Sequence, residues 1–327
     1  MRLFANANYD FLSQRKWAYG ISVAFIAIGL IVLLIRGVNY SVEFTGGTLI
    51  QVETQQAADI GALRDALQMR GIPNAEIQTF GSDREIVVRA RVARAGSDAN
   101  DTQATAEAVA QALDATLGAG RYQILRTEAV GPKVGGELRQ QAVLAILMSF
   151  LAVLAYLAYR FEWRFGVAAI VATAHDIIIA IAFIGLARIE VSLFVVAGLL
   201  TIVGYSLNDT IVIFDRIREN LHLLKRESLS SILNRSINET LPRTFFTGTT
   251  AFGSLLALSV LGGDVVRPFA LLMLFGVIVG TFSSIYIAAP VLLAIETRWP
   301  GPDAKGHLGQ KVAAPPAGSR KPQPVSS

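Results

Sequence analysis

The stretch "VGYSLNDTIVIFDRIREN", residues 203–220, decides how the whole chain is interpreted. It begins as an apolar run of the kind that crosses a membrane, yet Asn208, Asp209 and Thr210 follow one another before that run ends. A charged side chain within a membrane span is costly, and it most often marks a pathway, a relay or a paired site. The surrounding sequence therefore has to show whether Asp209 lies in a membrane helix and which side chain could balance its charge.

The apolar blocks identify a membrane protein. Of the 327 residues, 53% are hydrophobic and 17% are charged, and the apolar residues lie in long blocks, as is typical of membrane proteins. A helix needs about 20 apolar residues to cross a bilayer. Blocks of that length occur at about 17–35, 141–159, 166–186, 191–213, 244–261 and 268–295. The sequence thus predicts an α-helical polytopic membrane protein with six transmembrane helices, the first uncleaved because no A-x-A site follows it.

Positive charges predict the orientation of these helices. Lys and Arg are concentrated before the first block, in the loops after the second and fourth, and after the sixth. That side faces the cytoplasm by the positive-inside rule, so both termini are predicted to be cytoplasmic. Residues 37–139, predicted to lie outside, contain 10 Lys and Arg and 13 Asp and Glu. The rest of the chain contains 19 Lys and Arg and 12 Asp and Glu. The net charge of +4 reflects this bias and does not indicate a nucleic-acid partner.

The outer segment, residues 37–139, has the periodicity of an α+β domain. Alternation typical of strands and spacing typical of helices succeed one another along it. The strands are expected at 46–54, 75–81, 84–92 and 121–130, and the helices at 55–71 and 102–120. This βαββαβ order predicts a ferredoxin-like domain between the first and second transmembrane helices. Arg89, Arg91 and Arg94 are expected at a solvated edge and loop, because Asp98 and Asp101 follow them.

The chain divides into five predicted parts. Residues 1–16 form a cytoplasmic N-terminus, residues 17–36 the first helix and residues 37–139 the outer domain. Residues 140–296 contain helices two to six, and within them residues 215–242 form an amphipathic cytoplasmic segment, expected as one or two helices along the membrane surface. Residues 297–327 are rich in Pro, Gly and Ser and are expected to be a disordered cytoplasmic tail.

Motifs of covalent chemistry are missing from the sequence. It contains no cysteine, its histidines are only His175, His222 and His307, and neither HExxH nor GxxxxGK[ST] occurs. Thiolate sites, zinc sites and nucleotide hydrolysis are therefore not expected. The prediction is a protein that is not an enzyme and that holds no cofactor and no metal.

Asp209 and Arg243 are the main candidate site. Asp209 lies about 9 Å inside the end of its span, counted from Asp215 at 1.5 Å per residue, and Arg243 enters the next span from the same face. Their pairing could merely pin two helices together, with Asn208 and Thr210 satisfying neighbouring polar groups. Alternatively Asp209 is a proton relay, because burial raises the pKa of a carboxyl group and a close arginine lowers it. The residues alone leave both interpretations open.

A second polar site is possible at His175 and Asp176 in the third span, where the simpler interpretation is a polar contact between helices or with water. Small residues predict close helix contacts in spans five and six. They are Gly248, Thr249, Gly253, Gly276 and Gly280.

Five motifs, taken together, resemble the SecF branch of the SecD/SecF family, which is related to the resistance-nodulation-division exporters. The likeness runs from about Asp10 to about Trp299. The motifs are "SVEFTGGTLIQV" (41–52), "VGPKVGGELRQQA" (130–142), "AHDIIIAI" (174–181), "TIVGYSLNDTIVIFDRIREN" (201–220) and "NRSINETLPRTFFTGTTAF" (234–252). Glu43 stands where the family commonly has Asp, which leaves the role of that acid open.

The resemblance implies a function and partners. Such proteins pair with SecD in the bacterial inner membrane and use the proton-motive force to drive late, outer-side steps of polypeptide export. SecA and the SecYEG channel act before them, and YajC and YidC are further candidate partners. The family's proton-pathway acid and its arginine fall on Asp209 and Arg243, and its first periplasmic domain on residues 37–139.

Two other functions remain as alternatives. The chain could be half of a proton-coupled small-molecule or lipid exporter of the same superfamily, although a self-sufficient exporter has two six-span halves and this chain has one. It could also be a structural scaffold for the channel, which would leave the Asp209–Arg243 arrangement without a purpose beyond packing.

Overall fold

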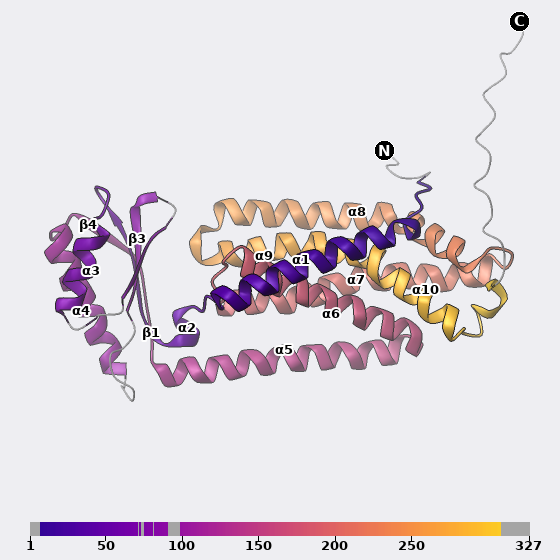
Figure 1. The fold of residues 1–327 in the computed structure, drawn as a ribbon, viewed down its shortest axis with the longest axis horizontal. Coiled ribbons are helices and arrows are strands. Elements are labelled where there is room, and N and C mark those ends of the chain that lie inside the picture. The colour runs from indigo at the N-terminus through magenta and orange to yellow at the C-terminus, as the bar shows by residue number, and fades with distance from the viewer. Residues whose placement is uncertain (1–6, 71, 73–74, 81, 91–98, 309–327) are drawn as a thin grey trace, which may run out of the picture. The chain divides into compact units, whose positions relative to one another are not determined.

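The computed structural model describes residues 7–70, 72, 75–80, 82–90 and 99–308 (Figure 1). The chain forms two compact units, and each is described by itself. The helical unit comprises Met1–Arg36, Phe150–Ala187 and Gly198–Ser327. The sheet unit comprises Gly37–Ser149 and Arg188–Ala197.

Long helices dominate the described part of the chain. Their bounds are α1 Arg15–Arg36, α5 Pro132–Arg160, α6 Trp163–Leu186, α7 Leu193–Leu223, α8 Leu229–Leu261, α9 Gly263–Ser283 and α10 Ala289–Arg298, with the single turns η1 Leu12–Gln14, η2 Ser284–Ala288 and η3 Lys305–His307. Helix α9 continues through η2, a π-helical turn, into α10. In the described residues, six helical stretches are long and apolar enough to cross a membrane, so the six predicted apolar helices are confirmed.

Helices α7 and α8 extend well beyond the apolar blocks. Residues 215–242, predicted as one or two helices along the membrane surface, instead continue α7 to Leu223 and begin α8 at Leu229. That prediction was wrong because the apolar stripe of this segment packs into the core of the helical unit. Ile217 and Ile232 are fully buried there, each at 0% exposure.

The first residues of the predicted disordered tail are packed. Helix α10 reaches Arg298, and beyond it Ala304 and His307 are 1% and 4% exposed. The His307 ring lies between two backbone carbonyls, with Nδ1 2.8 Å from the oxygen of Glu227 and Nε2 3.1 Å from that of Leu221. The prediction was wrong for residues 297–308, of which 297 and 298 belong to α10, and residues 309–327 lie outside the described part.

The sheet unit confirms the predicted βαββαβ order. Its strands are β1 Gly47–Thr54, β2 Glu76–Phe80, β3 Ser82–Ala90 and β4 Tyr122–Val130, and its helices are α2 Val42–Thr45, α3 Ile60–Met69 and α4 Ala99–Leu117. The strand order is β2-β3-β1-β4, with every described pair antiparallel. Helices α3 and α4 cover one face of the sheet (Figure 1). The core between them is formed by side chains such as Val52, Leu67, Ile86 and Leu113, all at 0% exposure.

The segment before α7 is bound to the sheet unit by polar contacts. Arg89 of β3 forms an ion pair with Glu190, and its side chain is only 14% exposed. Burial raises the pKa of Glu190, and the positive charge of Arg89 opposes that shift. The expectation of a solvated Arg89 was therefore wrong, because its partner lies 101 residues away. Arg91 and Arg94 lie outside the described residues.

Glu43 has a definite contact in the sheet unit. Its Oε2 accepts a hydrogen bond of 2.6 Å from the backbone N–H of Leu193, the first residue of α7. A carboxylate is favourable at a helix N-terminus, where N–H groups lack partners within the helix. Val191, just before α7, also exchanges backbone hydrogen bonds with Asn39 (2.8 Å) and Ser41 (3.0 Å). Residues 39–43 thus hold the start of α7.

Close helix packing in the helical unit depends on glycines. A Cβ at Gly276 would lie 2.4 Å from Ile202 Cγ1, and one at Gly280 would lie 3.2 Å from Ser206 Cα, so both predicted contacts are confirmed. Gly248 has ordinary contacts, the nearest at 3.7 Å. A Cβ at Gly253 would have no described atom of another helix within 4 Å, so the contact predicted there is not made inside the described part of this chain. Thr249 is exposed and nothing described places it in a helix contact.

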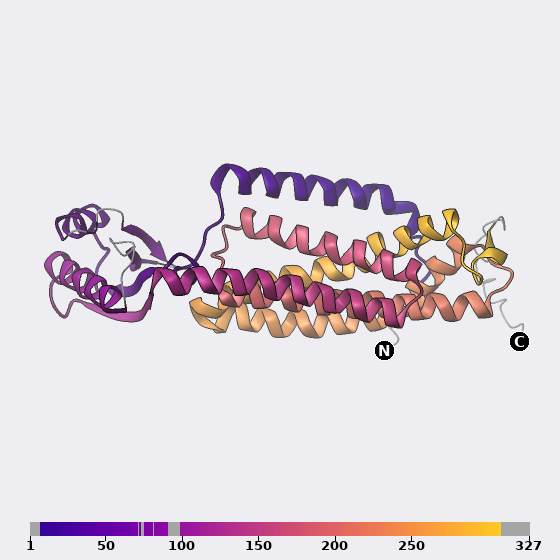
Figure 2. The same ribbon diagram turned by 90° about the horizontal axis from the view of Figure 1, so that it is seen from below.

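Gly29 makes an equally tight approach, between α1 and α6, which Figure 2 shows running alongside each other. A Cβ there would lie 2.4 Å from Ala182 Cβ and 2.8 Å from its Cα, so backbone would have to move. We therefore expect Gly29→Ala to destabilise the protein by about 1–3 kcal/mol. Gly20→Ala is the matched control, because Gly20 is also on α1 but a Cβ there would have no described atom of another element within 4 Å. Thermal unfolding in lipid nanodiscs checks this, and equal midpoints for the two variants would contradict the packing described here.

Candidate functional site

Asp209 is buried on α7 at 2% exposure. The described contact of its carboxylate is a long hydrogen bond of 3.5 Å donated by Thr281 Oγ1 of α9. Arg243 of α8 is exposed and forms no ion pair with Asp209 in this structure, although its charge acts on the carboxylate over a longer distance. The arrangement is therefore an open pair, in which the acid and the arginine interact without being locked together.

The neighbours of Asp209 in the sequence have different surroundings. Thr210 is 1% exposed, and its hydroxyl lies 2.9 Å from Ser284 Oγ, where α9 passes into η2. Asn208 is exposed. Of the predicted triplet, Asp209 and Thr210 thus face the interior and Asn208 does not.

Two buried hydroxyl groups near Asp209 and Arg243 have no described hydrogen-bond partner. They are Tyr205 Oη, one turn before Asp209 on α7, and Thr244 Oγ1, next to Arg243 on α8. A Cβ at Gly248 of α8 would lie 3.7 Å from Thr281 Oγ1 and 3.8 Å from Tyr205 Oη, so α8 passes close to the surroundings of Asp209. Unpartnered buried hydroxyls are rare in native structures and call for a functional or structural reason. Sequence reasoning missed Tyr205, Thr244 and Thr281.

The second predicted site, at His175 and Asp176, is the more fully bonded of the two. Asp176 of α6 is 0% exposed. Its carboxylate accepts hydrogen bonds from Ser206 of α7 and, at 2.7 Å, from Ser283 of α9, and it lies 2.9 Å from His175 Nδ1. The other ring nitrogen of His175 lies 3.0 Å from Ser22 Oγ of α1. Residues of α6, α7 and α9 therefore meet at this carboxylate, and α1 joins the cluster through the His175 ring. The three serines were not predicted from the sequence.

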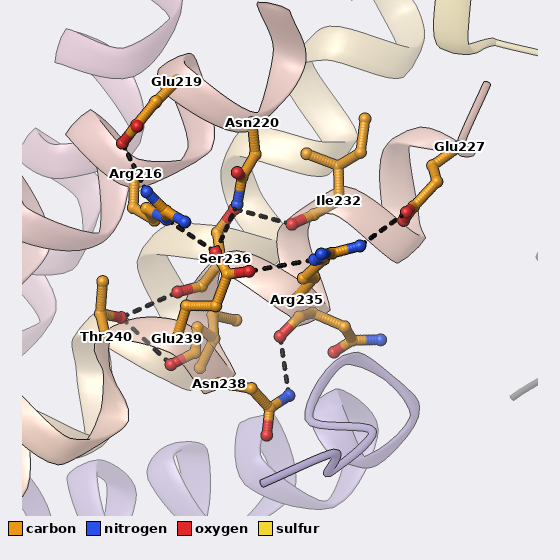
Figure 3. A network of polar contacts seen from close by, with 12 residues as sticks. Arg216, Glu219, Asn220, Glu227, Ile232, Arg235, Ser236, Asn238, Glu239 and Thr240 are labelled. Carbon is orange, nitrogen blue, oxygen red and sulfur yellow. Dashed lines mark hydrogen bonds and ion pairs between the residues drawn. The ribbon is translucent and has the colours of Figure 1, made fainter. Parts of the chain in front are cut away.

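A charged network joins the end of α7 to the start of α8 (Figure 3). Glu239 is its centre: Oε2 accepts from Arg216 Nε at 2.6 Å and from Asn220 Nδ2 at 2.8 Å, and Oε1 accepts from Arg235 Nε at 3.0 Å. Arg235 also pairs with Glu227 at 2.9 Å. Asp209 and Arg243 lie further along the same two helices, so this network restrains the helices that carry the site. The i,i+4 spacing of Arg235 and Glu239 and the i,i+3 spacing of Arg216 and Glu219 were the signals in the sequence.

Glu239→Gln should loosen this junction. The amide would turn a donor toward groups that are themselves donors, and the negative charge between two arginines would be lost. Because the Glu239 side chain is 29% exposed, we expect a loss of about 1–2 kcal/mol of unfolding free energy. Glu219→Gln is the control, since Glu219 is 55% exposed and its described partner is Arg216 alone. Thermal unfolding measures the stability of both variants. An unchanged unfolding midpoint for Glu239→Gln would show that the network does not stabilise the protein.

Metal-ligating residues do not cluster in the described part of the chain: no three His, Cys, Asp or Glu side chains there are placed to hold an ion. Buried carboxylates with hydroxyl groups and an arginine nearby, as described here, are chemically able to bind and release protons.

Comparison with known proteins agrees with this architecture. Residues 85–298 match the family model "Protein export membrane protein SecD/SecF, C-terminal", and residues 31–58 match the "SecD/SecF GG Motif". Among curated relatives, the "Protein translocase subunit SecF" of Gemmatimonas aurantiaca is 53% identical over 308 residues, covering 92% of this chain and 91% of the relative. The "Protein translocase subunit SecF" of Escherichia coli O157:H7 is 38% identical over 290 residues, which cover 89% of this chain and 88% of that relative.

Solved structures of the same family also match this chain. The crystal structure of SecDF from Thermus thermophilus, a translocon-associated membrane protein, is 36% identical to this chain and superposes with a TM-score of 0.78. The match covers 90% of this chain but only 40% of that one. A second SecDF structure, in a form described as super-membrane-facing, superposes with a TM-score of 0.65. The chain described here is therefore a multi-pass membrane protein that belongs to the SecD/SecF family of protein export membrane proteins.

Proposed function

We propose that this chain is an accessory subunit of Sec-dependent protein export, which uses the proton-motive force to drive late, outer-side steps of polypeptide translocation. The observation that carries the proposal is the open pair: Asp209 is 2% exposed within an apolar helix and has no closed ion pair with Arg243. A carboxylate that was only a structural pin would be expected to hold its arginine directly, because an uncompensated buried charge is costly.

The mechanism follows from the charges. Ionised Asp209 is attracted by Arg243, and protonated Asp209 is not, so each proton taken up weakens the attraction between α7 and α8. Moving one charge through a potential of 100 mV supplies about 2.3 kcal/mol, which is enough to shift a balance between two packings. Because Thr281 of α9 also contacts Asp209 at 3.5 Å, the protonation state would be sensed by three helices.

The partners belong to the proposal as well. The chain spans 40% of the SecDF chain it matches, which supports pairing with a SecD-type half. SecYEG, SecA acting before it, YajC and YidC, and the translocating polypeptide are the further partners we infer. The proposed setting is the bacterial inner membrane with both termini cytoplasmic. The sheet unit, with strand order β2-β3-β1-β4, would be a ferredoxin-like periplasmic domain that works beside its SecD counterparts.

The test uses inverted membrane vesicles from cells that contain this chain and its partner, and compares them with vesicles depleted of the chain. We expect completion of preprotein export to respond to the proton gradient only when the chain is present. An equal response to a protonophore in both kinds of vesicle would contradict the proposal. Purification of the chain from the native membrane tests the alternative that it is half of a small-molecule or lipid exporter. A stable homodimer without a SecD-type partner would favour that alternative.

A further inference from the structure

Asp176 is a buried acid that the proposed pathway through Asp209 does not use. At 0% exposure, its carboxylate receives hydrogen bonds from Ser206 and Ser283 and lies 2.9 Å from His175 Nδ1. Such a group in a membrane helix is costly unless its charge is balanced. Among the described contacts, the one group that can balance it is His175, which is adjacent in the chain and bonded to it.

The proton content of the pair decides its charge. When the exchangeable proton is on the ring, His175 is an imidazolium and Asp176 is ionised. The two N–H groups of the ring then donate to Asp176 Oδ1 and, at 3.0 Å, to Ser22 Oγ. The same proton can pass to the acid: the Nδ1–H bond breaks, an Oδ1–H bond forms and the nitrogen recovers its electron pair. The ring is then neutral, and both forms have no net charge and satisfy every contact.

Loss of that proton is also compatible with the geometry. The neutral ring then donates through Nδ1 to Asp176 and accepts at Nε2 from the Ser22 hydroxyl, which only has to rotate. The pair would carry a single negative charge, stabilised by the hydroxyls of Ser206 and Ser283. No side chain has to change its position between the two proton contents. This is the property expected of a site that binds and releases a proton.

The cluster is also connected to the surroundings of Asp209. Ser206 lies three residues before Asp209 on α7, and Ser283 lies two residues after Thr281 on α9. Other titratable groups lie on the elements packed against α6 but do not appear among the contacts described for Asp176. Among them are Tyr19 of α1, Tyr205 and Asp209 of α7, Tyr286 of η2 and, two residues before the end of α10, Glu296.

We propose that His175 and Asp176 form a second proton-binding site, which holds one exchangeable proton at neutral pH and whose charge is sensed by α1, α6, α7 and α9. The inference extends the proposed function, but it concerns protons bound by this chain and can be tested without any export assay.

The test combines two spectroscopies on the full chain in lipid nanodiscs. Nitrogen NMR of labelled histidine has only three residues to resolve, and His175→Gln assigns the signal. Infrared spectroscopy detects a protonated Asp176 as a carboxyl band that disappears in Asp176→Asn. That variant still accepts the serine hydrogen bonds but cannot ionise. His222→Gln is the control, since the exposed His222 ring is 64% accessible and should not affect His175.

At neutral pH we expect either an imidazolium signal from His175 or a carboxyl band from Asp176, and we expect the signal to be lost as the pH is raised. In Asp176→Asn, His175 should be neutral, because no carboxylate balances its charge. The inference is overturned if His175 is neutral and Asp176 ionised at neutral pH, which is the pattern of a plain structural carboxylate. It is also overturned if the proton cannot be removed before the protein unfolds. Failure of the proposed function would appear separately, as export that does not depend on the proton gradient.

Discussion

Asp209→Asn is expected to abolish the proton-driven stage of export while the protein still assembles. Asn has nearly the same shape and can still accept the hydrogen bond from Thr281 Oγ1, now 3.5 Å away, but it cannot take up or release a proton. Preprotein export in inverted vesicles should therefore fall to the level found with a protonophore, whatever the gradient.

Asp215→Asn is the matched control for this experiment. Asp215 lies on the same helix, but its side chain is 41% exposed and pairs with the partly exposed Arg160 at 2.8 Å. Surface pairs of this kind contribute little, so export should be unchanged. If Asp209→Asn exported at the wild-type level with a collapsible gradient present, Asp209 would not be the coupling residue.

Arg243→Met is expected to have the second largest effect. It removes the positive charge that acts on the Asp209 carboxylate but retains a long side chain where α8 passes α7. Without that charge, the ionised and protonated forms of Asp209 would differ much less in their attraction to α8, so the proton-driven stage should be strongly impaired.

Arg243→Lys separates charge from shape. Lysine keeps the positive charge but lacks the planar fork of arginine, so we expect a smaller loss of proton-driven export than for Arg243→Met. The same vesicle assay measures both variants. Full activity of both would remove Arg243 from the mechanism.

The sequence predicted the spans well because their signal is local. About 20 consecutive apolar residues identify a membrane helix without knowledge of its neighbours. The helix ends were harder to predict, because α7 continues to Leu223 and α8 begins at Leu229 through residues that are buried only once the two helices pack. The packing of Ala304 and His307 against the helical unit likewise depends on contacts distant in sequence.

The surroundings of Asp209 and Asp176 were only partly predictable, again because their contacts join residues that are distant in sequence. A lone acid in an apolar run is visible in any sequence, so Asp209 and Asp176 could be named. Their partners Thr281, Ser206 and Ser283 are single hydroxyl residues among many, and only the packing of α9 against α7 and α6 brings them to the carboxylates. The open arrangement with Arg243 could not be predicted either, since sequence spacing permits a closed pair equally well.

Proton flux is the most direct test of the central claim that Asp209 binds and releases protons for transport. The chain and its SecD-type partner are reconstituted into liposomes that contain a pH-sensitive dye, and an inward proton gradient is imposed. The proposed mechanism predicts proton entry for the wild-type protein and for Asp215→Asn, and none above the lipid background for Asp209→Asn. Entry through Asp209→Asn at the wild-type rate would contradict it.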